Sequence, residues 1–256
     1  MITLHVHPSE AHDVEVPEHD FAHVYGFAPL LSRAMTGLPD ALHAQMCAPV
    51  MCGVAVHDAR TVLGLKAWRD CVEGSGREGG MWTMYELEKL LRMTLRQSVL
   101  AADVISSVAS GDFDGGWILS QALTWDFPVA LAQQCTLSMA HMREDIRDFF
   151  ASPERVIYMA WTLLTGVTLA RQSLYCRHFP TLMEHHEDRL LTQALLDVTR
   201  GADVDGEACG VMAQRFEHLY DELMTRAQNN LPQRPAGYDV LHEFLIEQRM
   251  STTRIG

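Results

Sequence analysis

The sequence contains almost no lysine. Lys66 and Lys89 are the only two lysines in 256 residues, so nearly all of the 20 basic side chains are arginines. Arginine and lysine form no cluster, and the formal net charge is -13. Because affinity for a phosphate backbone depends on clustered positive charge, we expect no direct binding to nucleic acid. The scarcity of lysine beside abundant Ala, Gly, Asp and Val is typical of a GC-rich coding sequence, bacterial or phage.

The chain also lacks an apolar run long enough for a membrane-spanning helix. Its most apolar stretch, residues 156–170, is shorter than the roughly 20 residues that a span requires, and Arg171 follows it. Residues 1–20 lack the basic leader and apolar segment of a secretory signal. We therefore predict a buried central helix at 156–170, no membrane binding, and a cytoplasmic location, or a virion location for a protein of phage origin.

No C-x-x-C pair occurs among the six cysteines, which lie scattered in apolar stretches. Paired cysteines at close spacing are typical of zinc sites and redox motifs, whereas scattered cysteines in a chain of this size are typical of buried thiols. We therefore predict six thiols and no disulfide, as expected in a reducing compartment.

Helical periodicity dominates from about residue 20 onward, whereas strand-like alternation is confined to ITLHVH at the start. The expected helices are 20–35, 54–72, 87–108, 126–149, 153–178, one that opens at 181 and contains the His pair, 208–227 and 238–249. The helix at 87–108 follows a capping-box pair, Thr83 and Glu86, and the one at 153 follows Ser152. The sequence therefore predicts an all-α fold, a multi-helix globular bundle of about eight helices with a short extended N-terminal arm.

Composition divides the chain into three parts. Residues 1–20 are predicted to be an extended acidic, His-rich arm, because they contain five carboxylates, four histidines and few apolar side chains. Residues 21–230 are predicted to form a helical core domain, in which the Gly-rich stretch 74–80 is a flexible connector. Residues 231–256 are predicted to be a linker followed by an amphipathic C-terminal helix.

His185, His186 and Glu187 are adjacent in the predicted helix that begins at Thr181, and all three residue types bind metal ions. The triplet resembles a ligand segment of the hemerythrin-like, cation-binding helical bundles. That resemblance, which covers three residues, implies a non-haem metal site completed by ligands from other helices. We therefore name His185, His186 and Glu187 as candidate metal ligands.

Two other histidines have a carboxylate one helical turn away, namely His141 with Glu144 and His218 with Glu222. Both histidines fall in polar rows of their helices, and the order of ligands in the hemerythrin-like family does not map onto this chain. Only His186 falls on an apolar face. We therefore expect His186 to be buried and hydrogen-bonded, His141 and His218 to be mostly exposed, and no cofactor to be required.

Two shorter patterns also resemble metal-binding motifs. The segment HVHPS at residues 5–9 resembles the first strand of metal-dependent hydrolases, but those enzymes need a β/α barrel, and no further strands are expected here. The Asp-x-Asp-Gly segments 112–115 and 203–206 resemble part of an EF-hand loop, but lack its first and twelfth ligands. We predict that both Asp-x-Asp-Gly segments are turns whose aspartates cap the following helices.

The chain contains no G-x-S-x-G elbow, phosphate loop or G-x-G-x-x-G motif after a strand. We therefore predict a non-enzymatic helical structural or adaptor subunit of a larger assembly, such as a phage particle. Its partners would be proteins, in a homo- or hetero-oligomeric assembly, bound by the C-terminal helix and by the arm, where ITLHVH could add a strand to a neighbour. A metal-dependent helical-bundle enzyme using His185, His186 and Glu187 is one alternative. A helical small-molecule-binding protein lined by Met and Trp is the other.

Overall fold

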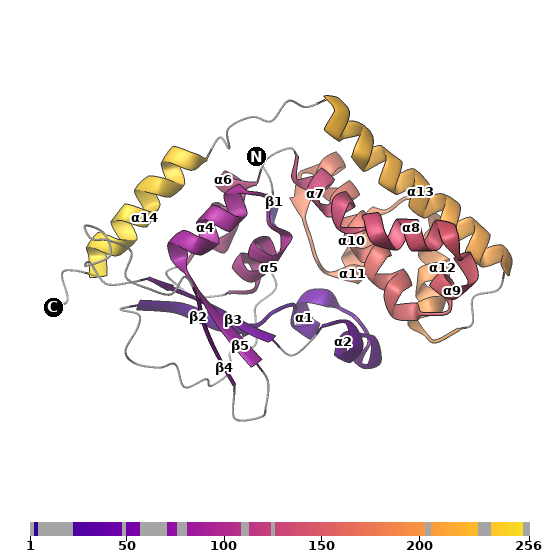
Figure 1. The fold of residues 1–256 in the computed structure, drawn as a ribbon, viewed down its shortest axis with the longest axis horizontal. Helices are drawn as coiled ribbons and strands as arrows, with labels where there is room; N and C mark the ends of the chain where they lie inside the picture. Colours follow the sequence, from indigo (N-terminus) through magenta and orange to yellow (C-terminus); the bar gives the residue numbers. More distant parts are fainter. Residues whose placement is uncertain are drawn as a thin grey trace. The chain divides into compact units, whose positions relative to one another are not determined.

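Helices dominate a computed structural model of the chain, but they accompany a four-stranded sheet (Figure 1). The structure describes residues 3–4, 23–47, 50–56, 71–75, 81–108, 113–123, 126–202, 206–229 and 237–252. By its internal contacts the chain divides into two compact units. Unit 1 consists of Met1–His5, Thr36–Met46 and Trp125–Pro232, and unit 2 consists of Val6–Met35, Cys47–Thr124 and Gln233–Gly256. The division into 1–20, 21–230 and 231–256 stays a prediction.

Unit 2 is built on a mixed sheet with the strand order β2-β3-β5-β4. Its strands are β2 (His23–Pro29), β3 (Val50–Val56), β4 (Cys71–Ser75) and β5 (Met81–Glu86). The central pair, β3 and β5, is parallel, and each edge strand is antiparallel to its neighbour. The prediction of a mainly helical globular protein is confirmed, but the terms all-α and about eight helices were imprecise, because the structure contains this sheet and more helices.

The missed strands replace two predicted helices. The helix expected at 20–35 contains β2, and the one expected at 54–72 contains the end of β3 and the beginning of β4, while 57–70 lie outside the described residues. All of β3 from Cys52 to Val56 is buried. A strand that is buried on both faces has no polar alternation, so its sequence does not differ from a buried helical segment.

One face of the sheet has its own apolar cluster, made of Ala55, Val72, Trp82 and Met84. Phe27 of β2 packs edge-on against Trp82, with ring centroids 5.6 Å apart. Gly74 of β4 lies so close that a β-carbon there would overlap the indole of Trp82. The glycine expected in a flexible connector is therefore a strand residue that makes room for Trp82. The rest of that connector, 76–80, lies outside the described residues.

In the part of unit 2 that the structure describes, four longer helices accompany the sheet: α4 (Leu87–Leu95), α5 (Val99–Ser107), α6 (Gly115–Ala122) and α14 (Tyr238–Thr252). Helix α4 continues directly from β5 and packs on β3 and β5, and α14 packs against α4 and α6 (Figure 1). The helix predicted at 87–108 is two helices, because Gln97 adopts a left-handed conformation (φ 62°) and Ser98 caps α5. The predicted C-terminal helix is confirmed as α14.

Unit 1 surrounds a single buried helix, α10 (Pro153–Gln172). The helices packed around it are α2 (Asp40–Met46), α7 (Phe127–Gln134), α9 (Ile146–Phe150), α11 (Phe179–His185), α12 (Arg189–Thr199) and α13 (Gly206–Asn229), and α8 (Thr136–Glu144) packs on α7 and α9. A four-residue helix, α1 (Arg33–Thr36), precedes α2. All of α10 from Met159 to Ala170 is buried, so the predicted central helix is confirmed. None of the helices that the structure describes has the length and apolarity to cross a membrane.

Local capping explains where unit 1 departs from the predicted helices. Ser152 caps α10 as expected, but α10 ends at Gln172, because Ser173 is left-handed (φ 55°). The helix expected at 126–149 is divided into α7, α8 and α9, with breaks at Cys135 and Asp145. The Asp145 carboxylate accepts a hydrogen bond from the backbone N–H of Asp148, which starts a new helix there.

The predicted arm lies outside the described residues except for β1 (Thr3–Leu4). This strand pairs in parallel with β6 (Leu174–Tyr175), which follows α10. Thr3 and Leu4 therefore pair within the chain, and the expectation that ITLHVH adds a strand to a neighbour stays a prediction.

Candidate functional site

The triplet His185, His186 and Glu187 lies between two helices and not inside one. Helix α11 ends at His185, and His186 is its C-cap. The Asp188 carboxylate then accepts hydrogen bonds from the backbone N–H groups of Leu190 and Leu191, which starts α12. The sequence predicted an uninterrupted helix here, and the reason for the difference is this N-cap. His185 and Glu187 are exposed.

His186 is half-buried, so the prediction that it is buried is wrong. Its imidazole has no hydrogen-bond partner among the described residues. Burial lowers the pKa of His186 below its ordinary value, an effect that nearby Asp188 opposes. Close by, Arg171 of α10 holds Glu222 of α13 through two hydrogen bonds of 3.0 and 2.6 Å. The carboxylate of Glu222 is therefore already bound to arginine.

The other paired histidines are surface residues. His218 is exposed, as predicted. His141 is half-buried, so the prediction that it is mostly exposed is wrong. Its Nε2 lies 2.9 Å from the carboxylate of Asp148, which also binds Arg155 at 3.0 Å. Glu222, the predicted partner of His218, is the carboxylate that binds Arg171. Within the described residues, no group of three or more His, Cys, Asp or Glu side chains could hold a metal ion.

The remaining sequence candidates are helix caps or lie outside the described residues. Asp114 caps α6, accepting a hydrogen bond of 2.9 Å from the N–H of Trp117, as predicted for the first Asp-x-Asp-Gly segment. In the second segment only Gly206 is described, at the start of α13. The HVHPS segment at 5–9 is outside the described residues.

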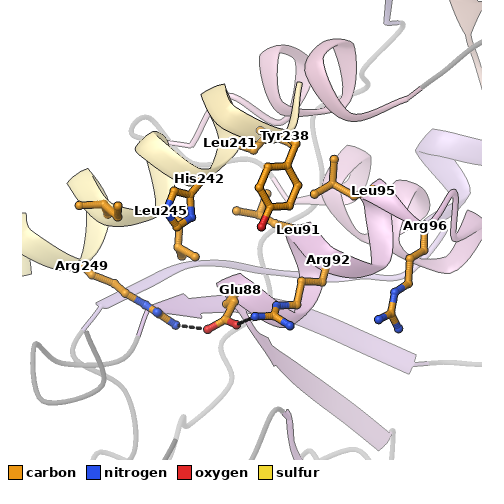
Figure 2. Close-up of a pocket in the computed structure, with 11 residues that line it drawn as sticks. Glu88, Leu91, Arg92, Leu95, Arg96, Tyr238, Leu241, His242, Leu245 and Arg249 are labelled. Carbon is orange, nitrogen blue, oxygen red and sulfur yellow. Dashed lines mark hydrogen bonds and ion pairs between the residues drawn. The ribbon is translucent and has the colours of Figure 1, made fainter. Parts of the chain in front are cut away.

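In unit 2 a groove lies between α4 and α14, and we call it the α4–α14 groove (Figure 2). Its volume is about 630 Å³, well within the range of about 300–1,000 Å³ that is usual for ligand pockets. The apolar side chains along it are Leu91, Leu95, Tyr238, Leu241, Leu245 and Ile246. The charged or polar ones are Glu88, Arg92, Arg96, His242 and Arg249. The groove therefore combines an apolar floor with a rim in which guanidinium groups predominate.

Helix α14 is held in place by one buried row of side chains. Leu241, Leu245 and Arg249 are each four residues apart and at most 9% exposed, and this spacing puts them on one helix face. Gly237, just before α14, packs against the backbone of Gln121 at the end of α6. A β-carbon at Gly237 would overlap the carbonyl oxygen of Gln121, so the approach of α14 to α6 requires glycine.

Two contacts beside this row fix the rotation of α14 about its axis. The ring of Phe244 packs against Trp117 of α6, with centroids 5.4 Å apart. Gln248 accepts a hydrogen bond from the hydroxyl of Tyr25 in β2, and the Tyr25 ring packs on Phe113. Helix α14 is therefore attached to the rest of unit 2 by apolar, aromatic and polar contacts together.

A buried charge network closes one end of the groove. The Arg249 Nη2 lies 2.6 Å from Glu86 Oε1 and 3.0 Å from Glu88 Oε2. Glu88 also binds Arg92, at 2.6 Å (Figure 2). The other oxygen of Glu86 caps α4 by accepting a hydrogen bond of 3.1 Å from the N–H of Lys89. Two carboxylates and two guanidiniums thus balance one another, which offsets the cost of burying charge.

The outer faces of the two helices differ in charge. Arg92 and Arg96 are exposed on α4, one turn apart. Glu243 and Glu247 are exposed on α14, also one turn apart. Arg96, Glu243 and Glu247 make no ion pair within the part of the chain that the structure describes. The basic row therefore lines the groove, whereas the acidic row lies on the outer face of α14, outside the groove lining.

Large apolar side chains are also exposed on α14. Tyr238, Val240, Ile246 and Met250 are each 40 to 52% exposed. Ile246 lies on the groove side of the helix, and Met250 is one turn further along. The sequence identified α14 as amphipathic, but this groove was missed, because half of it comes from α4, about 150 residues earlier in the chain. The signals present were the paired arginines on α4 and the outward-facing apolar residues of α14.

Comparison of the chain with protein-family models, with curated proteins and with solved structures gives no match. The function must therefore be argued from the described geometry.

Proposed function

We propose that this protein is a non-enzymatic structural or adaptor subunit of a larger protein assembly, and that a protein partner binds along α14 and the α4–α14 groove. The observation that carries this proposal is the exposure of Tyr238, Val240, Ile246 and Met250 on a helix that a buried row, Leu241, Leu245 and Arg249, anchors. The proposal includes a location in the cytoplasm or in a virion. It also includes partners that are neither nucleic acids nor membranes.

The composition of this surface is that of a protein interface. A single exposed apolar side chain is ordinary on any protein surface. Here several lie on one helix beside an apolar groove with an arginine rim. Tyrosine, methionine and arginine are enriched in the centres of protein interfaces. Tyr238, Met250 and Arg92 supply all three on adjoining helices.

The rigidity of α14 also favours this function. Binding costs less free energy when the binding surface is already ordered. The buried row from Leu241 to Arg249 holds α14 on unit 2, and the ring of Phe244 packs on Trp117. Helix α14 therefore presents its outer face to a partner without having to fold first.

A second function is favoured by the size of the groove. A volume of about 630 Å³ with an apolar floor and an arginine rim would accommodate an amphiphilic small molecule with an acidic head group. Arg96 would then face the head group, and Leu95 and Leu241 the apolar body. Mass spectrometry of an organic extract from the natively purified protein tests this alternative. One equivalent of such a molecule would favour it over a protein partner.

The assembly proposal is tested by the mass of the native particle in extracts of the source cells. We expect a mass larger than the 28.7 kDa of one chain, and a shift toward one chain when Ile246→Asp places a charge in the groove. The matched control is Leu137→Asp on α8, where the side chain is 84% exposed and belongs to unit 1. A single-chain mass for the unmodified protein, or equal effects of the two variants, would contradict the proposal.

A further inference from the structure

We infer that the partner in the α4–α14 groove is a second copy of this chain, related to the first by a two-fold axis. This inference rests on the proposed function and names the partner. The basic row on α4 (Arg92 and Arg96) and the acidic row on α14 (Glu243 and Glu247) are the observations that carry it. Both rows belong to unit 2. The basic row lines the groove, and the acidic row lies on the outer face of α14, the helix that forms one wall of the groove.

The two rows match in spacing. Residues four apart on a helix have β-carbons roughly 6 Å apart. Arg92 and Arg96 therefore present two positive charges at the same interval at which Glu243 and Glu247 present two negative charges. A helix carrying the acidic row can thus lie along α4 with both carboxylates near both guanidiniums. Opposite charges arranged in this way select a partner and its register.

In a dimer with a two-fold axis, the match between the basic row and the acidic row occurs twice. In a symmetric dimer the same surface patch contacts its own copy, so residue i of one subunit contacts residue j of the other, and the reverse. Placing the axis along the groove sets α14 of each copy beside α4 of the other. The basic row of each subunit then meets the acidic row of its partner, and no row remains without an opposite.

The apolar residues agree with the same arrangement. Ile246 and Tyr238 lie beside the groove, and Met250 is exposed next to the acidic row. A second α14 helix that lies across the groove covers all three, and its own three residues are covered in return. Fully covered apolar side chains at the centre and charged pairs at the rim are the usual anatomy of a protein interface.

Other occupants satisfy only part of the surface. An acidic peptide or an acidic amphiphile would meet Arg92 and Arg96, but it would leave Glu243 and Glu247 without opposite charges. It would also leave Met250 exposed. The second copy is the occupant whose charges complement both rows.

The test begins with the purified full chain, alone in solution. We expect sedimentation or light scattering to give twice the 28.7 kDa of one chain, with dissociation increasing as sodium chloride is raised. Reversing the basic row (Arg92→Glu with Arg96→Glu) should weaken the dimer roughly tenfold or more, because each reversed pair occurs twice. Reversing the acidic row (Glu243→Arg with Glu247→Arg) should do the same.

Mixing the two variants provides the decisive measurement. The first variant has two acidic rows and the second has two basic rows, so each repels itself and complements the other. We expect each to be a monomer alone and the mixture to form a heterodimer about as stable as the unmodified dimer. Because Arg92 also binds Glu88, Arg96→Glu alone serves as a milder variant, and circular dichroism checks that every variant is folded.

Matched controls reverse exposed charges of unit 1. Arg147→Glu on α9 and Glu207→Arg on α13 change the net charge in the same directions without touching the groove, and they should leave the dimer intact. A purified chain that stays monomeric, or a dimer that both reversals leave unchanged, would overturn the inference. If the purified chain is monomeric but its assembly in cell extracts still depends on Ile246, the proposed function survives and only the second copy is excluded. If neither the purified chain nor the cell extract contains an assembly, both proposals fail.

Discussion

The guanidinium of Arg249 lies 2.6 Å from the carboxylate of Glu86, a residue 163 positions earlier in the chain. This contact connects α14 to the junction between β5 and α4, because Glu86 is both the last residue of β5 and the N-cap of α4. The side chain of Glu86 is only 3% exposed and that of Arg249 only 11%. One ion pair therefore joins the sheet and both helices of the groove.

Removing Arg249 should destabilise unit 2 strongly. Arg249→Ala leaves Glu86 buried without its cation, and breaking a buried pair in this way typically costs about 3–5 kcal/mol. Urea unfolding should show a loss of this size. Arg200, which is 66% exposed and lies 3.5 Å from Asp197, is the control, and Arg200→Ala should cost less than about 1 kcal/mol.

The same experiment includes a rescue. Arg249→Met combined with Glu86→Gln removes both charges, while the side-chain amide oxygen that Glu86→Gln introduces can still cap α4. Because replacing both partners of a buried pair is much less costly than removing one, the double variant should recover most of the lost stability. Equal losses in Arg249→Ala and Arg200→Ala would show that the buried pair contributes little.

The parts of the fold that the sequence predicted are those determined by local signals. Helix α10 begins at Pro153, a proline in the first helical turn, and Ser152 before it is the hydroxyl cap. Helix α14 has apolar residues at helical spacing after a Pro- and Gly-containing linker. Both were predicted nearly in full, because capping and helical period depend only on neighbouring residues.

The sheet was missed because its evidence is non-local. β3 is buried between β2 and β5, which come from other parts of the chain, and its residues carry no polar alternation. Glu86 was identified as part of a capping box with Thr83, yet Thr83 is a strand residue and Glu86 itself is the cap. The α4–α14 groove likewise depends on tertiary contacts, so only the amphipathic character of α14 was visible beforehand.

Gly237→Ala should loosen α14. The added β-carbon would overlap the backbone oxygen of Gln121, which cannot move like a flexible side chain. Overpacking of this kind typically costs about 1–3 kcal/mol. Hydrogen exchange measured by mass spectrometry should show faster exchange in α14, with little change in α10 of unit 1.

A matched glycine provides the control. Gly210 of α13 is exposed and has open space around its β-carbon position. Gly210→Ala should therefore stabilise the protein by roughly 0.5–1 kcal/mol, because alanine favours a helix interior over glycine. If both substitutions stabilise the protein, the approach of α14 to α6 is not as close as the structure gives it.

The cysteines should differ widely in reactivity. All six are present as thiols, and five of them are buried. Burial raises the pKa of Cys52 and of Cys135 to about 12, so at pH 8 almost none of either is the reactive thiolate. Cys71 is half-buried, and its accessibility should make it the first to react with a disulfide reagent.

Thiol titration with and without denaturant measures this difference. The unfolded chain should release six equivalents, and the folded chain should show one fast equivalent that Cys71→Ser removes. A fast phase that persists in Cys71→Ser would mean that one of the buried thiols is accessible. Fewer than six equivalents after denaturation of a fresh preparation would instead indicate a disulfide.

His186 should make unit 1 less stable in mild acid. Burial holds the pKa of His186 below its ordinary value of 6.5 in the folded chain, while the unfolded chain takes up a proton near 6.5. Between these two pKa values the unfolded state binds more protons, so stability is full above pH 6.5 and falls as the pH decreases below it. The carboxylates bound to arginine, such as Glu222, affect the pH dependence of stability only nearer their ordinary pKa of 4.5.

Replacing the imidazole by an amide in His186→Gln should therefore flatten the dependence of the unfolding free energy on pH between 6.5 and 4.5. Urea unfolding at several pH values measures this slope, and His185→Gln, which changes the exposed neighbour, should retain the slope because His186 is still present. An unchanged slope in His186→Gln would show that solvent reaches this imidazole as freely in the folded chain as in the unfolded one.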